Sequence, residues 1–199
     1  LLEWGYSLLL LWMIHTFLPL RKHPVFWVPA ILLFQFLASV IIYSNDADGL
    51  LGAMAGFLIW LGVFHRGRWI ERLTAVLVFY PAIIAINYLT QDIGSRLFFF
   101  VSGAPAEPSS GGWTEADFLL STAIHTASLL FRLLFWIAAW LMMKQYLRQI
   151  TYHLTTRMWL IVDALMLAPF VAIATILYTM PEDPLIVYPI CLASVFSSF

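Results

Sequence analysis

Seven long runs of apolar residues, each separated from the next by a polar or charged segment, make up most of the chain. Five of them have at least the roughly 17 residues that a transmembrane helix needs, whereas the third and the seventh are shorter. The pattern predicts an all-α fold, a polytopic transmembrane bundle of six to seven helices. The predicted segments cover residues 4–20, 25–43, 50–64, 72–90, 118–143, 158–179 and 185–199.

Composition agrees with a location in the membrane. Of the 199 residues, 62% are hydrophobic and only 11% are charged, whereas a soluble domain carries about 25% charged residues. Mean hydropathy is +0.89. The formal net charge of −1 offers no basic surface for nucleic acid, so we expect no nucleic-acid partner. The lipid bilayer is the first partner that these values predict.

The sign of the charged residues alternates from one polar segment to the next, which predicts an orientation. Eight of the ten Lys and Arg lie in three of these segments, residues 21–24, 65–72 and 144–157. The intervening segments, at 44–49, 91–117 and 180–184, contain one basic residue, Arg96. Because cytoplasmic loops are enriched in Lys and Arg, we expect the N-terminus outside the cell and the C-terminus inside.

We interpret residues 1–199 as one transmembrane domain whose last helix is truncated, and residues 91–117 as an extracellular loop. Thr114 and Asp117, at the end of this loop, have the spacing of a capping box that begins the fifth helix. Gly52 and Gly56 form a GxxxG pair in the third segment, which permits close approach of helices. That approach serves either packing within the bundle or a dimer seam.

The fifth segment contains a polar stripe with an arginine in the middle of the predicted span. At 100° per residue, five polar side chains fall within about 80° of one another. Such a stripe must face the bundle interior or a wet cavity, because a bare charge at the bilayer centre costs several kcal/mol. The five residues are Asp117, Ser121, His125, Ser128 and Arg132.

Arg132 therefore needs partners inside the bundle. Asp163 in the sixth segment is the acidic residue that the pattern places within a span, and Asn87 and Tyr80 of the fourth are neutral alternatives. One interpretation is a structural ion pair or hydrogen-bond network that holds helices five and six together; the other is a ligand pocket or relay that opens outward. The candidate ligand-binding or switch residues are Ser121, His125, Ser128, Arg132, Asp163 and Asn87.

No local pattern predicts catalysis or metal binding. The sequence has no phosphate-binding GxxxxGK[ST], no HExxH and no GxGxxG. The other four histidines have no carboxylate or cysteine at ligand spacing, and Cys191 is the single cysteine. We therefore expect no catalytic residue, no metal site and no cofactor in this segment.

Three stretches combine a basic turn with an apolar helix. They are LPLRKHPVFWVPAILLF (18–34), FHRGRWIERLTAVLVFYPAIIAINYL (64–89) and YLRQITYHLTTRMWLIVDALMLAPFVAIATILY (146–178). Together they resemble the membrane sensor region of bacterial GHKL-type sensor histidine kinases, the class that includes the quorum-sensing peptide receptors of the accessory-gene-regulator kind. The first two look like an inner turn followed by a helix of that region, and the third looks like its inner linker, a Trp at the helix entry, a mid-helix Pro and a short outer turn.

This resemblance implies the receptor part of a homodimeric two-component kinase. It would bind an extracellular signal, which is often a peptide in that class, and pass it through the last helix to a cytoplasmic kinase domain. That domain would use ATP and Mg²⁺ and phosphorylate a response regulator, and none of its motifs lies within these residues. The alternative from the residues themselves is a small-solute transporter or the substrate-binding membrane subunit of one, which the intramembrane stripe also fits.

Overall fold

A computed structural model describes residues 2–21, 23–39, 47–103, 114–153, 155–179 and 184–197. Within these residues it contains seven α-helices, one short 3-10 helix and an isolated β-bridge between Leu20 and His65. The fold is therefore all-α, as predicted. The helices are α1 (Leu2–Phe17), α2 (Trp27–Ser39), α3 (Ala47–Phe64), α4 (Trp69–Ser102), α5 (Glu115–His153), α6 (Thr156–Thr179) and α7 (Pro184–Ser197), and the 3-10 helix η1 is Pro24–Phe26.

Each of the seven predicted segments coincides with a helix, but α4 is much longer than predicted. Residues 91–102, which the sequence pattern assigned to the extracellular loop, continue α4 as regular helix. The helix ends where Gly103 adopts a left-handed conformation, with φ of 62°, and donates its N–H to the carbonyl of Phe99. The prediction placed the boundary too early because polar residues interrupt the apolar run after Leu89 without breaking the helix.

The helix α5 begins as the capping box predicted. Asp117 N donates to Thr114 Oγ1 over 3.3 Å, and Thr114 N donates to Asp117 Oδ2 over 2.8 Å. These reciprocal bonds satisfy backbone donors that the first turn of a helix leaves open. The 39 residues of α5 correspond to roughly 58 Å at 1.5 Å per residue. Both α4 and α5 therefore exceed the roughly 30 Å thickness of a bilayer core.

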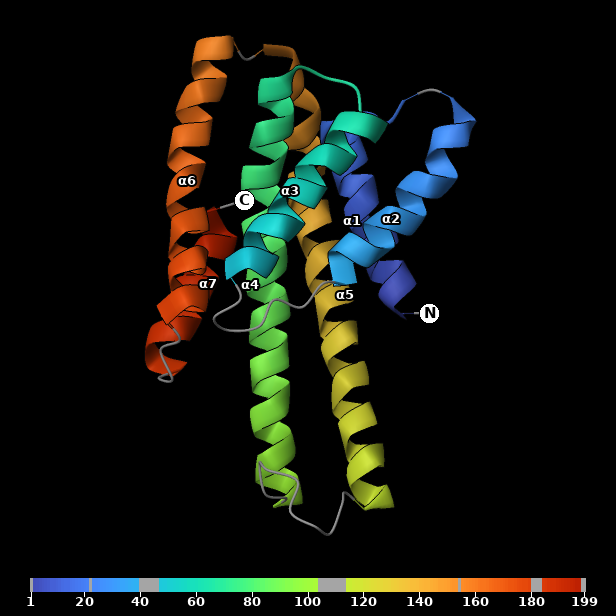
Figure 1. The fold of residues 1–199 in the computed structure, drawn as a ribbon, viewed down its shortest axis with the longest axis vertical. Helices are drawn as coiled ribbons and strands as arrows, with labels where there is room; N and C mark the ends of the chain where they lie inside the picture. Colours follow the sequence, from blue (N-terminus) through green and yellow to red (C-terminus); the bar gives the residue numbers. More distant parts are fainter. Residues whose placement is uncertain are drawn as a thin grey trace.

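Helix α4 is the centre of the bundle. It packs against α3, α5, α6 and α7, and Figure 1 shows it between α6 on one side and α5 on the other. Its most apolar window is 83% buried, compared with 17% for α5 and 28% for α6. Helix α1 packs on α5 and α2, α2 packs on α3, and α3 crosses α4 and also contacts α6.

Three helices are long and apolar enough to cross a membrane, namely α4, α5 over Glu115–Lys144, and α6 over Thr156–Ile176. Helices α2, α3 and α7 are apolar but shorter. Large apolar side chains cover the outer sides of the helices, and Phe36, Ile59, Leu134 and Leu165 are each more than half exposed. Exposure of this extent suits contact with lipid. Apolar surface is costly to expose to water but not to the hydrocarbon chains of a bilayer.

The polar turns at 18–21 and 65–68 meet at one end of the bundle, which we call the basic end. Arg21 N donates to the carbonyl of Phe64 over 2.9 Å, and Arg66 N donates to the carbonyl of Pro19 over 2.8 Å. The first two predicted basic segments therefore lie together. Most of the third, residues 144–153, continues α5 as helix, and it lies at the same end (Figure 1).

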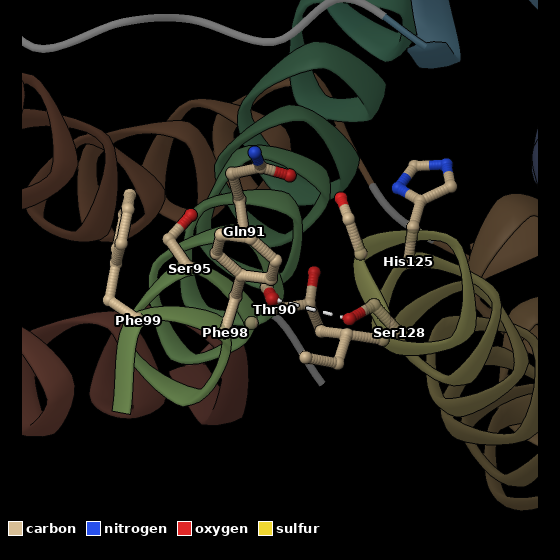
Figure 2. Close-up of a pocket in the computed structure, with 10 residues that line it drawn as sticks. Thr90, Gln91, Ser95, Phe98, Phe99, His125 and Ser128 are labelled. Carbon is tan, nitrogen blue, oxygen red and sulfur yellow. Dashed lines mark hydrogen bonds between the residues drawn. The ribbon is translucent and has the colours of Figure 1, made fainter. Parts of the chain in front are cut away.

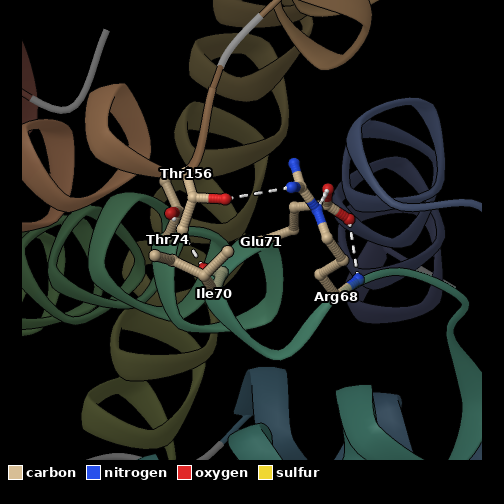
Figure 3. A network of polar contacts seen from close by, with 5 residues as sticks. All are labelled: Arg68, Ile70, Glu71, Thr74 and Thr156. Atoms are coloured by element: carbon tan, nitrogen blue, oxygen red, sulfur yellow. Dashed lines mark hydrogen bonds and ion pairs between the residues drawn. The ribbon is translucent and has the colours of Figure 1, made fainter.

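A second set of contacts at the basic end joins α4 to α6. The guanidinium Nε of Arg68 donates to Glu71 Oε1 over 2.7 Å, and its Nη1 donates to Thr156 Oγ1 over 3.3 Å (Figure 3). Glu71 Oε2 also accepts the backbone N–H of Arg68, which caps the first turn of α4. The start of α4 and the start of α6 are therefore held side by side by hydrogen bonds.

The GxxxG pair occupies two different environments. A Cβ on Gly56 would lie 3.5 Å from Leu37 of α2, an ordinary packing distance, whereas a Cβ on Gly52 would meet nothing within 4 Å. Gly56 therefore packs within the bundle, and Gly52 lies on an open face of α3. A role of that open face in a dimer seam stays a prediction.

His65 at the basic end predicts a loss of stability in acid. Its Nδ1 donates to the carbonyl of Leu18 over 2.6 Å, its ring is fully buried, and Nε2 has no hydrogen-bond partner among the described residues. Burial lowers the pKa of this imidazole to about 4, and the hydrogen bond to Leu18 offsets only part of this decrease. Because the unfolded chain binds the proton more tightly, the free energy of unfolding should fall as pH drops from about 6.5 towards 4.

At pH 5 the expected loss from His65 is about 2 kcal/mol relative to pH 8. Thermal unfolding of the protein in lipid nanodiscs at the two pH values measures it. His65→Gln should remove this part of the pH dependence, while His23→Gln, at an exposed position of the same end, should leave it unchanged. Equal pH dependence in the wild type and His65→Gln would contradict the assignment.

Candidate functional site

Residues 90–99 of α4 and residues 121–128 of α5 enclose a groove, which we call the α4–α5 groove. It has a volume of about 200 Å³, and Figure 2 shows its lining residues on the facing sides of the two helices. It lies at the end of these helices opposite the basic end, beside the part of α4 that the sequence pattern had assigned to a loop (Figure 1). The lining residues are Thr90, Gln91, Gly94, Ser95, Phe98, Phe99, Ser121, Ile124, His125 and Ser128.

Helical spacing on both helices brings the polar lining residues together. Ser121, His125 and Ser128 recur at intervals of four and three on α5, so they share one face. On α4, Gln91 and Ser95 are four residues apart and also share a face. Three of the six residues predicted for a binding or switch role, all from α5, therefore line the same groove.

Gly94 sets the distance between the two helices. A Cβ at this position would lie 3.3 Å from Ile124 Cγ2 and 3.4 Å from Ser128 Oγ, closer than side chains normally pack. The absence of a side chain thus lets α5 approach α4 at this level. The groove opens beyond this contact point.

Thr90 and Ser128 form the floor of the groove. Ser128 Oγ donates to the carbonyl of Thr90 over 3.4 Å, a contact drawn in Figure 2. On the other side of Thr90 lies Arg132, whose Nε donates to Thr90 Oγ1 over 2.5 Å. Arg132 is only 6% exposed. The guanidinium is therefore placed directly behind the floor of the groove and is separated from the lining by one hydroxyl.

Asn87 connects Arg132 to the other helices. Arg132 Nη2 donates to the backbone carbonyl of Asn87 over 3.1 Å. The Asn87 side chain accepts the hydroxyl of Tyr6 on α1 over 3.2 Å and donates to the carbonyl of Ala38 on α2 over 3.3 Å. One polar residue of α4 thus links α1, α2 and α5 inside the apolar core. We call Arg132, Thr90, Asn87 and Tyr6 the buried polar network.

Asp163 does not pair with Arg132, contrary to one of the alternatives drawn from the sequence. Its Oδ1 accepts the hydroxyl of Thr74 on α4 over 2.5 Å, and Oδ2 has no hydrogen-bond partner among the described residues. Helix α4 lies between α5 and α6, so it separates the two charged side chains (Figure 1). Tyr80, the other neutral alternative, donates to the carbonyl of Leu50 instead. The expected lock between helices five and six is replaced by a lock between α5 and α4.

The charged residues nearest the groove are mostly engaged elsewhere. Asp92, next to Gln91 in sequence, accepts from Arg96 Nε over 2.8 Å and from the hydroxyl of Tyr188 on α7 over 2.7 Å. Glu3 of α1 lies 3.9 Å from His125 Nε2, and both side chains are about half exposed. The groove therefore has a histidine at its rim and an arginine behind its floor.

An apolar cleft lies along the same pair of helices. It has a volume of about 460 Å³ and shares Thr90, Gly94, Ile124 and Ser128 with the groove. The rest of its lining is apolar, consisting of Ile93, Leu97, Ala123, Ala127 and Phe131. One seam between α4 and α5 thus has a polar opening and an apolar one, with the close contact at Gly94 common to both.

Sequence reasoning missed the contribution of α4 to the groove. Gln91, Ser95, Phe98 and Phe99 all fall in the stretch interpreted as the start of the extracellular loop. The available signal was helical periodicity, because Gln91 and Ser95 lie four residues apart and no proline follows before the left-handed Gly103. That periodicity is weak on its own, since the apolar face of this stretch is narrow.

The chemistry of the groove is that of binding. Hydroxyl, amide and imidazole groups converge there with two phenylalanines, a combination suited to a small ligand with polar and aromatic parts. Within the described ranges, no three His, Cys, Asp or Glu side chains gather in a metal-binding arrangement. No protein-family model, curated protein or solved structure matches the chain.

The contact at Gly94 predicts unequal effects of two leucine substitutions. Gly94→Leu must push α4 and α5 apart and should lower stability by about 1–3 kcal/mol, the usual cost of overpacking. Gly52→Leu points into open space on α3 and should leave stability unchanged or slightly raised, because leucine favours helix. Thermal unfolding in the same nanodiscs measures both. A Gly94→Leu variant as stable as Gly52→Leu would show that the seam is loose.

Proposed function

We propose that the chain is the ligand-sensing transmembrane domain of a two-component sensor histidine kinase, with the α4–α5 groove as its signal site. The groove supports this because it combines polar groups from two helices near the end of the bundle opposite the basic end. In the proposed orientation the basic end faces the cytoplasm and the groove faces outward. A signal outside the cell would then reach the groove directly.

The observation that carries the proposal is the contact between α7 and the stretch of α4 that lines the groove. Gln91 lines the groove, and the next residue, Asp92, accepts a hydrogen bond from Tyr188 of α7 over 2.7 Å. A ligand that shifts this part of α4 therefore changes the position of α7. In the proposed receptor, α7 leads towards the cytoplasmic kinase, so this contact gives the signal a physical route.

The remaining partners belong to the same proposal. The receptor would be a homodimer, for which the open face of α3 around Gly52 is available. ATP and Mg²⁺ would be bound by the kinase domain that follows, and a bacterial response regulator would receive the phosphoryl group. The buried polar network would hold the resting arrangement of α1, α2, α4 and α5 until a ligand shifts it.

The gene sequence downstream of the codon for Phe199 tests the identity. We expect a soluble extension of a few hundred residues, roughly one or two domains, with a histidine-bearing helical pair and an ATP-binding domain. A stop codon soon after Phe199 would contradict the kinase, and a small-solute transporter would then account better for the groove. Further membrane spans without a soluble domain would have the same consequence.

Tyr188→Phe tests the route from the groove to α7 in the full-length protein. Loss of the hydroxyl removes the bond to Asp92, so signal-dependent autophosphorylation should fall several-fold while stability changes by only about 1 kcal/mol. Tyr178→Phe, at an exposed position of α6, is the matched control and should behave as wild type. An unaltered response in Tyr188→Phe would remove this contact from the signalling route.

A further inference from the structure

Arg132 is a buried cation without an acidic partner. Its hydrogen bonds go to the hydroxyl of Thr90 and the carbonyl of Asn87, and none of the ion pairs among the described residues includes it. A side chain that is 6% exposed keeps its charge at a substantial cost in an apolar surrounding unless an anion offsets that charge. Neutral hydrogen-bond acceptors satisfy its N–H groups but leave its charge uncompensated.

None of the nearby carboxylates forms an ion pair with Arg132. Asp163 is bonded to Thr74 on the far side of α4, and Asp92 is shared by Arg96 and Tyr188. Glu3 attracts the guanidinium from a distance, but it lies near His125 at the rim of the groove, and its side chain is 53% exposed. Screening by water weakens this attraction, so Glu3 offsets the charge of Arg132 only in part.

The groove is the space through which an external anion can approach Arg132. Thr90 is part of its floor, and Arg132 Nε lies 2.5 Å from the Thr90 hydroxyl on the other side. The remaining polar lining provides hydrogen-bond donors that suit an anion, namely the hydroxyls of Ser95 and Ser121 and the amide of Gln91. No carboxylate belongs to the lining.

We infer that the α4–α5 groove selects ligands that carry a carboxylate, which accepts hydrogen bonds from Ser95, Ser121 and Gln91 and lies in the field of Arg132. Phe98 and Phe99 provide the apolar wall for the rest of the ligand. This inference rests on the proposed function, because it names the chemical class of ligand for the same groove. It also gives Arg132 a role in ligand selectivity, whereas a purely structural hydrogen-bond network would give it none.

Three small probes of nearly equal shape test this inference on the chain in lipid nanodiscs. They are 3-phenylpropionate, 3-phenylpropan-1-ol and 3-phenylpropylamine, which present an anion, a neutral group and a cation on the same aromatic body. Saturation-transfer NMR at pH 8 measures their affinities. We expect the acid to bind at least about tenfold more tightly than the alcohol, and the amine more weakly still.

Two substitutions identify the source of this preference. Arg132→Met should abolish the preference for the acid, and Arg132→Lys should keep most of it, because the lysine retains the charge. Arg157→Met, which removes an exposed cation at the opposite end of the bundle, is the control and should bind as wild type does. If Arg132→Met does not fold, the order of the three probes on the wild type and on Arg132→Lys decides the question.

The outcomes separate this inference from the proposed function. Equal binding of acid and alcohol, or a preference for the amine, would overturn the selectivity for carboxylates and leave the groove as a binding site. An acid preference that survives in Arg132→Met would overturn the role of Arg132. Binding of none of the probes would overturn the groove as a site for small ligands, while the downstream gene sequence would still decide whether the protein is a kinase.

Discussion

The contact between α4 and α5 is the interaction on which the rest of the molecule depends. Gly94 allows the two helices to touch, and Arg132 crosses from α5 to bond Thr90 and Asn87 on α4. Asn87 in turn holds Tyr6 of α1 and the carbonyl of Ala38 on α2. The apolar interior offers these polar groups no water to bind. Each of these hydrogen bonds therefore satisfies a group that would otherwise be unpaired, and the network favours one arrangement of four helices.

The two halves of the central helix α4 differ in their surroundings. The half of α4 near the basic end is surrounded by other helices and is bonded to α6 through Thr74 and Asp163. Its other half has α5 on one side, with the groove between them, and Tyr188 of α7 bonded to Asp92. The groove and the contact with α7 therefore lie on one continuous helix.

The two openings along the α4–α5 seam also differ in what they can bind. The polar groove has hydroxyl and amide groups and the field of Arg132, whereas the apolar cleft is lined mainly by aliphatic side chains and Phe131. Because both share Thr90, Gly94, Ile124 and Ser128, a ligand or lipid chain in one opening acts on the same contact as a ligand in the other.

The sequence by itself determined the class of fold, the seven helices, the capped start of α5 at Thr114 and the polar face that contains Ser121, His125 and Ser128. These features depend on local periodicity and composition, which act over a few residues and are visible in the chain. Only the tertiary structure decided that α4 continues to Ser102, that α4 separates Arg132 from Asp163, and that Gln91 and Ser95 complete the groove. Which helix lies between two others is set by the packing of whole helix faces, and no single stretch of sequence contains that information.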